Sequence, residues 1–186
     1  MVSACLQAGF TLLELVVVLI ITLVLATTVL PSYSAWTAEL LIDGKIADLH
    51  AALRLARAEA VGMQHDIKFC PVNPDMKCQK SSDYRVLIFA DVNANNLLDY
   101  GDVPLRQIDL QELRVELRVS AGRPYIRYKY SGDSKEWGSV NLYNRLVDPE
   151  ASRQLVVNLG GRVRTAPDFN NDGLADDYRG WQVTCS

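Results

Sequence analysis

The sequence predicts an α+β fold, in which one long N-terminal α-helix packs against a C-terminal domain of antiparallel β-sheet. Three observations predict it. An apolar run occupies residues 10–36, and apolar residues then recur at helical spacing to about residue 62. Beyond that point, short alternating segments are separated by Gly, Pro and Asn, which is typical of antiparallel strands. A chain of 186 residues accommodates one globular domain and an anchor.

The apolar run is long enough for a membrane helix, since a bilayer core needs ~20 apolar residues in helical form. We therefore expect residues 10–36 to span a membrane. Glu14 is the only charged residue in the run. A carboxylate in lipid costs about 2.5–3.5 kcal/mol and requires a partner. The nearest plausible cation is a free amine at a new N-terminus, which predicts that residues 1–9 are a removable leader. The alternative is a plain signal anchor with an accidental Glu.

The amphipathic half of the helix is predicted over residues 37–62, with Gly62 as its end. Its apolar positions advance by three or four residues and form one face for packing against a sheet. These positions are Ile42, Ile46, Leu49, Leu53, Ala56 and Ala60. Glu39, Arg54 and Arg57 are expected on a solvated or intersubunit face.

Residues 63–186 are predicted to form the globular β-rich domain. Its expected strands cover residues 66–70, 84–90, 104–109, 113–119, 125–130, 139–143, 153–159, 162–165 and 180–184. The chain has a formal net charge of −3, so an anion-binding site must be a local patch.

Cysteine spacing fits an exported protein. Cys70 and Cys78 are eight residues apart with two prolines between them, so a small disulfide loop is expected in an oxidising compartment. Two unpaired thiols are the alternative. Cys5 lies in the predicted leader, and the sequence names no partner for Cys185.

The segment Gly9-Phe10-Thr11-Leu12-Leu13-Glu14 resembles the prepilin peptidase site of type IV pilins and type II secretion pseudopilins. The resemblance implies cleavage after Gly9 by prepilin peptidase and N-methylation of Phe10. It also implies that Glu14 pairs with the N-terminus of a neighbouring subunit, so that the partners are other major and minor pilins. The leader departs from the usual pattern because it lacks Lys and Arg.

Further motifs resemble the FimT, FimU and GspH group of minor pilins. They are Arg57-Ala58-Glu59-Ala60-Val61, the following Cys pair, the segment LIFADVN at residues 87–93, and GGRVR at residues 160–164. The resemblance implies a pilin-like fold. It also implies a single pass through the inner membrane with a periplasmic domain, followed by assembly into an extracellular pilus or a periplasmic pseudopilus. Many members pair a C-terminal Cys with one in a preceding strand, but near Tyr143 this sequence has none.

Within this group, FimT proteins bind DNA through a Gly-Arg-x-Arg motif, which Gly161, Arg162 and Arg164 match. On a strand, these two arginines would point the same way, ~6.6–7 Å apart. Such a pair can engage the phosphates of double-stranded DNA independently of sequence. Arg127 and Lys129 are candidate helpers, as are Arg114 and Arg118. The alternative for all of these residues is a solvated strand face.

Two loops rich in Asp and Asn have the oxygen-ligand spacing of weak Ca²⁺ sites. The better match contains Asp168, Asn170, Asp172 and Asp176; the other contains Asp91, Asn93, Asn95, Asp99 and Asp102. The alternative is ordinary hairpin turns, in which such residues are common. The sequence contains no catalytic constellation, so no enzyme activity is expected. A FimT-like DNA-capturing pilin, a FimU-like structural pilin and a GspH-like pseudopilin remain as hypotheses.

Overall fold

The computed structural model describes residues 11–111, 115–144, 148–170 and 176. It divides into two compact units, Met1–Glu39 and Leu40–Ser186. One helix, α1 (Leu12–Met63), contributes residues to both units.

In the first unit, α1 begins with a capping interaction. The backbone N–H of Glu14 donates to the Thr11 hydroxyl at 3.2 Å, so Thr11 is the N-cap and Glu14 is the third helical residue. This Thr-x-x-Glu arrangement is the sequence pattern of a capping box. Side chains from residue 11 to residue 27 are exposed. Among the described residues, no helix combines the length and apolar character that crossing a membrane requires.

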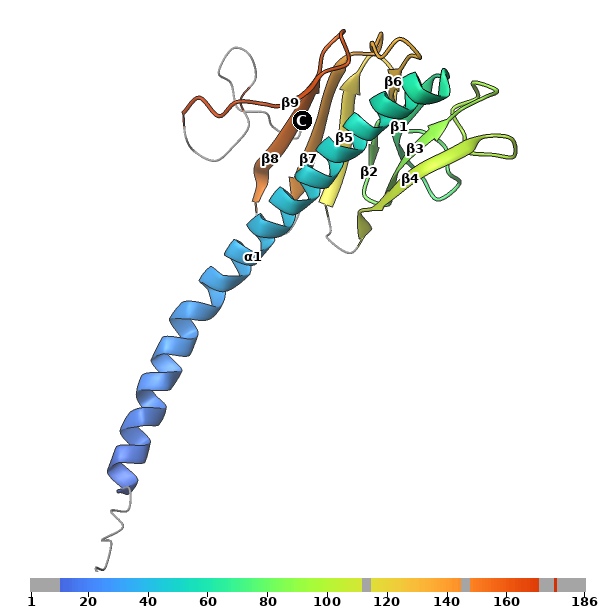
Figure 1. Ribbon diagram of the computed structural model, residues 1–186. Helices are drawn as coiled ribbons and strands as arrows, with labels where there is room; N and C mark the ends of the chain where they lie inside the picture. The colour runs from blue at the N-terminus through green and yellow to red at the C-terminus, as the bar shows by residue number, and fades with distance from the viewer. Residues whose placement is uncertain (1–10, 112–114, 145–147, 171–175, 177–186) are drawn as a thin grey trace, which may run out of the picture. The chain divides into compact units, whose positions relative to one another are not determined.

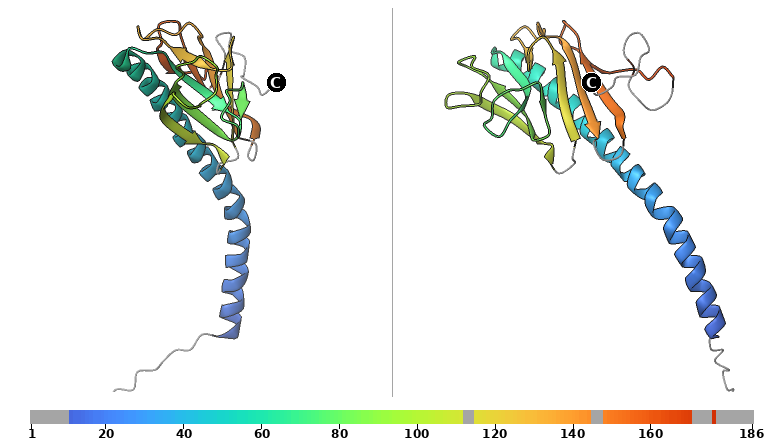
Figure 2. Two further views of the ribbon diagram at one scale, coloured as in Figure 1. Left: turned by 90° about the vertical axis from the view of Figure 1, so that its right-hand side faces the viewer. Right: turned by 180° about the vertical axis from the view of Figure 1, so that it is seen from behind.

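In the second unit, α1 buries the apolar face that its periodicity predicts. Leu49, Leu53, Ala56 and Ala60 are completely buried, and Ile42 is nearly so. Figures 1 and 2 show this half of α1 lying across one face of the strands. The helix ends one residue beyond the predicted end at Gly62.

The described strands form two antiparallel sheets. The first sheet has the order β4-β3-β1-β6, and the second has the order β2-β5-β7-β8-β9 (Figure 1). The strands are β1 (Ile67–Val72), β2 (Ser81–Ser82), β3 (Arg85–Ala90), β4 (Val103–Asp109), β5 (Val115–Ala121), β6 (Ile126–Tyr128), β7 (Gly138–Asn144), β8 (Asp148–Val157) and β9 (Val163–Thr165). Eight of these correspond to predicted strands; β2 was not predicted because it contains only two residues. The strand expected at residues 180–184 lies outside the described residues.

The main core joins the helix to both sheets. Leu49 and Leu53 of α1 share one buried cluster with Phe69 of β1 and with Leu117 and Leu142 of the second sheet. The opposite face of the first sheet has its own small core. There, Phe89 and Tyr125 pack with Cys70 and Cys78, which form a disulfide with Cα atoms 5.5 Å apart. Both faces of β1 are therefore covered, which explains why all six of its residues are buried.

Candidate functional site

The turn between β8 and β9 presents the Gly-Arg-Val-Arg segment. The Gly161 N–H donates to the Asn158 carbonyl at 2.9 Å, and the Asn158 N–H donates to the Arg162 carbonyl at 3.1 Å. The Asn158 side chain accepts from the Arg162 N–H at 2.9 Å. Gly161 has φ +72°, a left-handed conformation that glycine adopts without steric cost. The glycine is therefore required by the turn itself.

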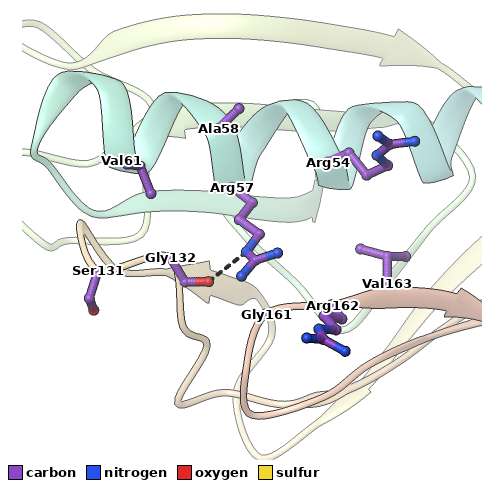
Figure 3. Close-up of a pocket in the computed structure, with 9 residues that line it drawn as sticks. All are labelled: Arg54, Arg57, Ala58, Val61, Ser131, Gly132, Gly161, Arg162 and Val163. Atoms are coloured by element: carbon purple, nitrogen blue, oxygen red, sulfur yellow. Dashed lines mark hydrogen bonds between the residues drawn. The ribbon is translucent and has the colours of Figure 1, made fainter.

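Arg57 of α1 holds this turn in place. Its Nε donates to the Gly132 carbonyl at 2.8 Å and its Nη2 donates to the Gly160 carbonyl at 3.0 Å. Figure 3 shows the first of these bonds, with Arg57 pointing from the helix toward the two loops. The expectation of a solvated position for Arg57 was wrong, because two loop carbonyls far along the chain accept hydrogen bonds from its guanidinium.

A hollow of about 780 Å³ lies between the end of α1 and these loops (Figure 3). Arg54 and Arg57 line it from the helix, and Arg162 lines it from the turn. Arg54 and Arg162 are exposed, whereas Arg57 is half-buried. Within the described residues, neither Arg54 nor Arg162 has an ion-pair partner. The hollow therefore concentrates positive charge at the end of the helix.

Arg164 is also exposed, but it lines a different hollow, together with Trp137 and Phe169. Arg162 and Arg164 therefore do not form the single pair on one strand face that the sequence predicted. Strand β9 begins only at Val163, so Arg162 belongs to the turn and does not follow strand alternation. The two arginines lie on either side of Val163, which packs against the core.

Arg127 is not the free helper that the sequence suggested. Its guanidinium binds both carboxylate oxygens of Glu136, with Nε–Oε2 at 3.1 Å and Nη2–Oε1 at 2.7 Å. Asp66 is a further neighbour at 3.9 Å. Burial alone would lower the pKa of Arg127, but the bond and attraction to Glu136 raise it above its usual value. This charge is already compensated within the domain.

The other candidate helpers for DNA binding lie in different parts of the chain. Lys129 lies just after β6, where its carbonyl accepts from the Gly132 N–H at 2.8 Å. It therefore borders the loop that Arg57 holds. Arg118 is half-buried in β5 of the second sheet, and Arg114 lies outside the described residues.

The side chain of Lys68 binds two residues of the first Asp/Asn loop. Lys68 Nζ lies 2.6 Å from Asp91 Oδ2 and also donates to Asn96 Oδ1 at 2.8 Å. Burial alone would raise the pKa of Asp91, but its bonds from Lys68 and from the Asn96 N–H lower it below the usual value. The Lys68 ammonium therefore binds Asp91, which is the first predicted Ca²⁺ ligand of this loop. This contact does not support the interpretation of the loop as a Ca²⁺ site.

The remaining predicted ligands of this loop bond to one another. The Asn93 and Asn95 side-chain amides donate to Asp99, at 3.1 Å and 2.6 Å respectively. Asp102 accepts from the Val92 N–H at 2.9 Å. These bonds give the loop the character of a hairpin turn closed by Asx side chains.

The second Asp/Asn loop is partly outside the described residues, since Asp172 falls there. Asp176 is buried, and its Oδ2 accepts from the Phe169 N–H at 2.7 Å. Its Oδ1 is buried and has no hydrogen-bond partner among the described residues. Asp168 is half-buried and Asn170 is exposed. Across the described parts of the chain, no three His, Cys, Asp or Glu side chains are grouped to hold a metal ion.

The processing residues Gly9 and Phe10 lie outside the described residues. Sequence reasoning also missed three side chains that organise the sites. Lys68 was detectable as a lysine inside an apolar strand, and Arg57 as a charge near the buried face of a helix. Glu136 had no such local signal, because it lies outside the strands and its partner Arg127 lies in β6.

Two family models match the chain. The model of type II transport protein GspH matches residues 45–161, and that of the prokaryotic N-terminal methylation motif matches residues 5–30. A comparison with curated protein sequences gave no match.

Solved structures of similar proteins are distant relatives. The type IV minor pilin FimU of Pseudomonas aeruginosa is 17% identical, with a TM-score of 0.49, over 74% of this chain and 91% of that one. The minor pseudopilin EpsH of the Vibrio cholerae type 2 secretion system is 15% identical, with a TM-score of 0.47, over 68% and 98%. The GspH model covers more than half of the sequence and the methylation motif precedes it, so the chain belongs to the GspH family of minor pilins and pseudopilins.

Proposed function

We propose that this chain is a FimT-like minor pilin that binds extracellular DNA for natural transformation. The observation that carries the proposal is the Gly161 turn, which presents Arg162 and Arg164 as exposed side chains on a braced support. Guanidinium groups bind phosphate oxygens through charge-assisted hydrogen bonds. Contacts of this kind position duplex DNA without reading its sequence. The role is one of binding and assembly, with no catalytic activity.

The proposed affinity of one subunit is low. Two phosphate contacts correspond to a salt slope of only ~−1.8 in log affinity against log salt concentration. Arg54 adds a third exposed cation beside Arg162, because both line the same hollow. Several subunits on one filament would raise the effective affinity further through multivalency.

The N-terminal segment supplies the setting for this role. We place cleavage by prepilin peptidase after Gly9, methylation on Phe10, and the Glu14 partner on the N-terminus of a neighbouring pilin. The immature chain then crosses the inner membrane once, with its globular domain in the periplasm. Mass spectrometry of the mature chain tests the cleavage position.

The double substitution Arg162→Gln with Arg164→Gln is expected to weaken duplex DNA binding at low salt by tenfold or more. The reason is the loss of both proposed phosphate contacts, each of which contributes through counterion release. A gel shift with a 30-base-pair duplex measures the effect. Lys77→Gln with Arg106→Gln removes the same charge elsewhere and should leave binding within about twofold. Unchanged binding in the first variant, or no binding by the wild type, would reject the DNA proposal.

A GspH-like pseudopilin of a type II secretion system is the second candidate. The match to the family of type II transport protein GspH favours it. A FimU-like structural pilin without DNA binding would give the same result in the gel shift. Both candidates predict that the wild-type protein retards no duplex even at low salt.

A Ca²⁺ ion at the second Asp/Asn loop is a separate proposal. The buried Asp176 carries one carboxylate oxygen that has no partner within the described part of the chain, and a cation would satisfy it. Asp168, Asn170 and Asp172 would supply further oxygens. Calorimetry with Ca²⁺ tests the proposal, and a flat titration would end it.

A further inference from the structure

A second basic hollow, of about 920 Å³, lies at the edge of the second sheet. It is separate from the hollow beside α1 and has no lining residue in common with it. Its lining comes from the start of β2, the end of β5 and the segment that leads into β7. The side chains that matter for its chemistry are Lys80, Arg118, Arg123, Lys135, Glu136 and Trp137.

Backbone pairing brings these segments together. Ser81 pairs with Arg118, and the Val119 N–H donates to the Lys80 carbonyl at 2.7 Å. On the other side of β5, Ala121 pairs with Gly138. A Cβ at Gly138 would lie 2.4 Å from the Ser120 carbonyl oxygen, so only glycine permits this close approach. The residue before it, Trp137, is thereby held at the rim of the hollow.

The charge in this hollow is strongly positive. Lys80, Arg123 and Lys135 are exposed, and Arg118 is half-buried. Among the described residues that line the hollow, the only carboxylate is that of Glu136, and Arg127 binds both of its oxygens. Three exposed cations therefore lie around one compensated acid, although the whole chain carries a net charge of −3. This concentration favours a ligand with several negative charges.

Trp137 adds an aromatic surface beside these cations. It is 61% exposed, although indole is a side chain that normally gains from burial. Its neighbour Glu136 is tied inward by Arg127, and Gly138 begins β7, so the indole is presented outward. Trp137 also lines the hollow that contains Arg164. It therefore connects the proposed DNA-binding segment with the second basic hollow.

We propose that this second hollow binds single-stranded DNA, with Trp137 stacking on a base and the three exposed cations holding the adjacent phosphates. Stacking on an exposed aromatic ring beside a positively charged groove is how proteins bind single strands without sequence preference. Bases within a duplex are paired and stacked, so they cannot present a face to the indole. The inference rests on the proposed DNA-binding function for its setting, but it needs neither Arg162 nor Arg164.

The test measures fluorescence anisotropy of labelled oligo-dT of 20 nucleotides with the full chain in neutral detergent. Trp137→Ala should weaken binding about fivefold or more, since one base–aromatic stack contributes ~1–3 kcal/mol. Trp137→Phe should retain most of the affinity, because phenyl also stacks. Tyr100→Ala is the matched control, since that side chain is fully exposed in a loop outside the hollow.

Charge is tested in the same assay. Arg123→Gln with Lys135→Gln should lower the affinity and reduce the salt slope by ~1.4, as expected for two contacts with a single strand. Lys77→Gln with Arg106→Gln serves as the charge control. Each variant is first checked for an unchanged melting temperature, which the exposure of these side chains predicts.

The outcomes separate this inference from the proposed function. Loss of oligo-dT binding in Trp137→Ala, with Phe retaining it, supports the inference even if Arg162→Gln with Arg164→Gln leaves duplex binding intact. Wild-type affinity in Trp137→Ala overturns it, whatever happens to duplex binding. Loss through the charge variant alone would show a plain anion patch and would also overturn it.

Discussion

Replacing Asp91 with asparagine is expected to lower the free energy of unfolding by about 3–5 kcal/mol, because it leaves a buried ammonium without its counter-charge. The Lys68 side chain is 5% exposed and the Asp91 side chain is 0% exposed. Lys68 would keep neutral contacts such as Asn96 Oδ1 and the Tyr125 ring, which lies 4.7 Å from its Nζ, in place of its partner carboxylate. Urea unfolding followed by circular dichroism measures the change at pH 7.

The control for this prediction is a pair on the same sheet whose carboxylate is exposed. Arg85 and Asp109 are 3.7 Å apart, and the Asp109 side chain is 44% exposed. Asp109→Asn should therefore cost ~0–1 kcal/mol. Lys68→Met with Asp91→Leu should cost less than Asp91→Asn alone, because neither charge is then left buried. Equal stability of wild type and Asp91→Asn would show that the pair contributes nothing.

The same pair predicts how stability depends on pH. The folded pKa of Asp91 lies below its usual value, because the bonds from Lys68 and Asn96 outweigh the effect of burial. A lowered carboxyl pKa stabilises the fold above the unfolded pKa of about 3.9, and this stability is lost as the pH falls through the folded pKa. The difference between wild type and Asp91→Asn should therefore be constant from pH 7 to about pH 5 and shrink below about pH 4.

Gly161→Ala is expected to be the second most damaging change, at about 2–4 kcal/mol, from backbone strain and overpacking together. Gly161 has φ +72°, and a Cβ there would lie 2.2 Å from the Gly132 carbonyl oxygen. That oxygen is the acceptor for Arg57 Nε, so relieving the overlap must disturb the bond that braces the turn. Duplex binding should fall as well, because Arg162 is the next residue. Thermal unfolding and the gel shift measure the two effects.

Substitutions at two other glycines distinguish the effect of backbone strain from that of overpacking. A Cβ at Gly160 would meet only the Asn158 side chain, at 3.6 Å, so Gly160→Ala should be nearly neutral. Gly101 has φ +105° but open space around it, so Gly101→Ala should show strain without overlap, ~1–2 kcal/mol. If Gly161→Ala costs no more than Gly101→Ala, the close contact with Gly132 is not a constraint on the turn.

Local patterns in the sequence determined the α+β class, the buried face of α1 and most of the strands. Leu49, Leu53 and Ala56 could be assigned to the core because a helix returns to the same face every three or four residues. The turn at Gly161 was also predictable, because few residues other than glycine adopt its conformation readily. The N-terminal motif could also be identified from the sequence, because its residues are contiguous.

Only the tertiary structure decided which charges remain available. Arg57 donates to carbonyls that are 75 and 103 residues away in the sequence, and Lys68 binds Asp91, which is 23 residues away. Whether such groups meet depends on how strands are ordered into two sheets and covered by loops, which periodicity does not encode. For the same physical reason, Arg127 became a structural partner of Glu136, while Trp137 and the cations around it were brought together at a sheet edge.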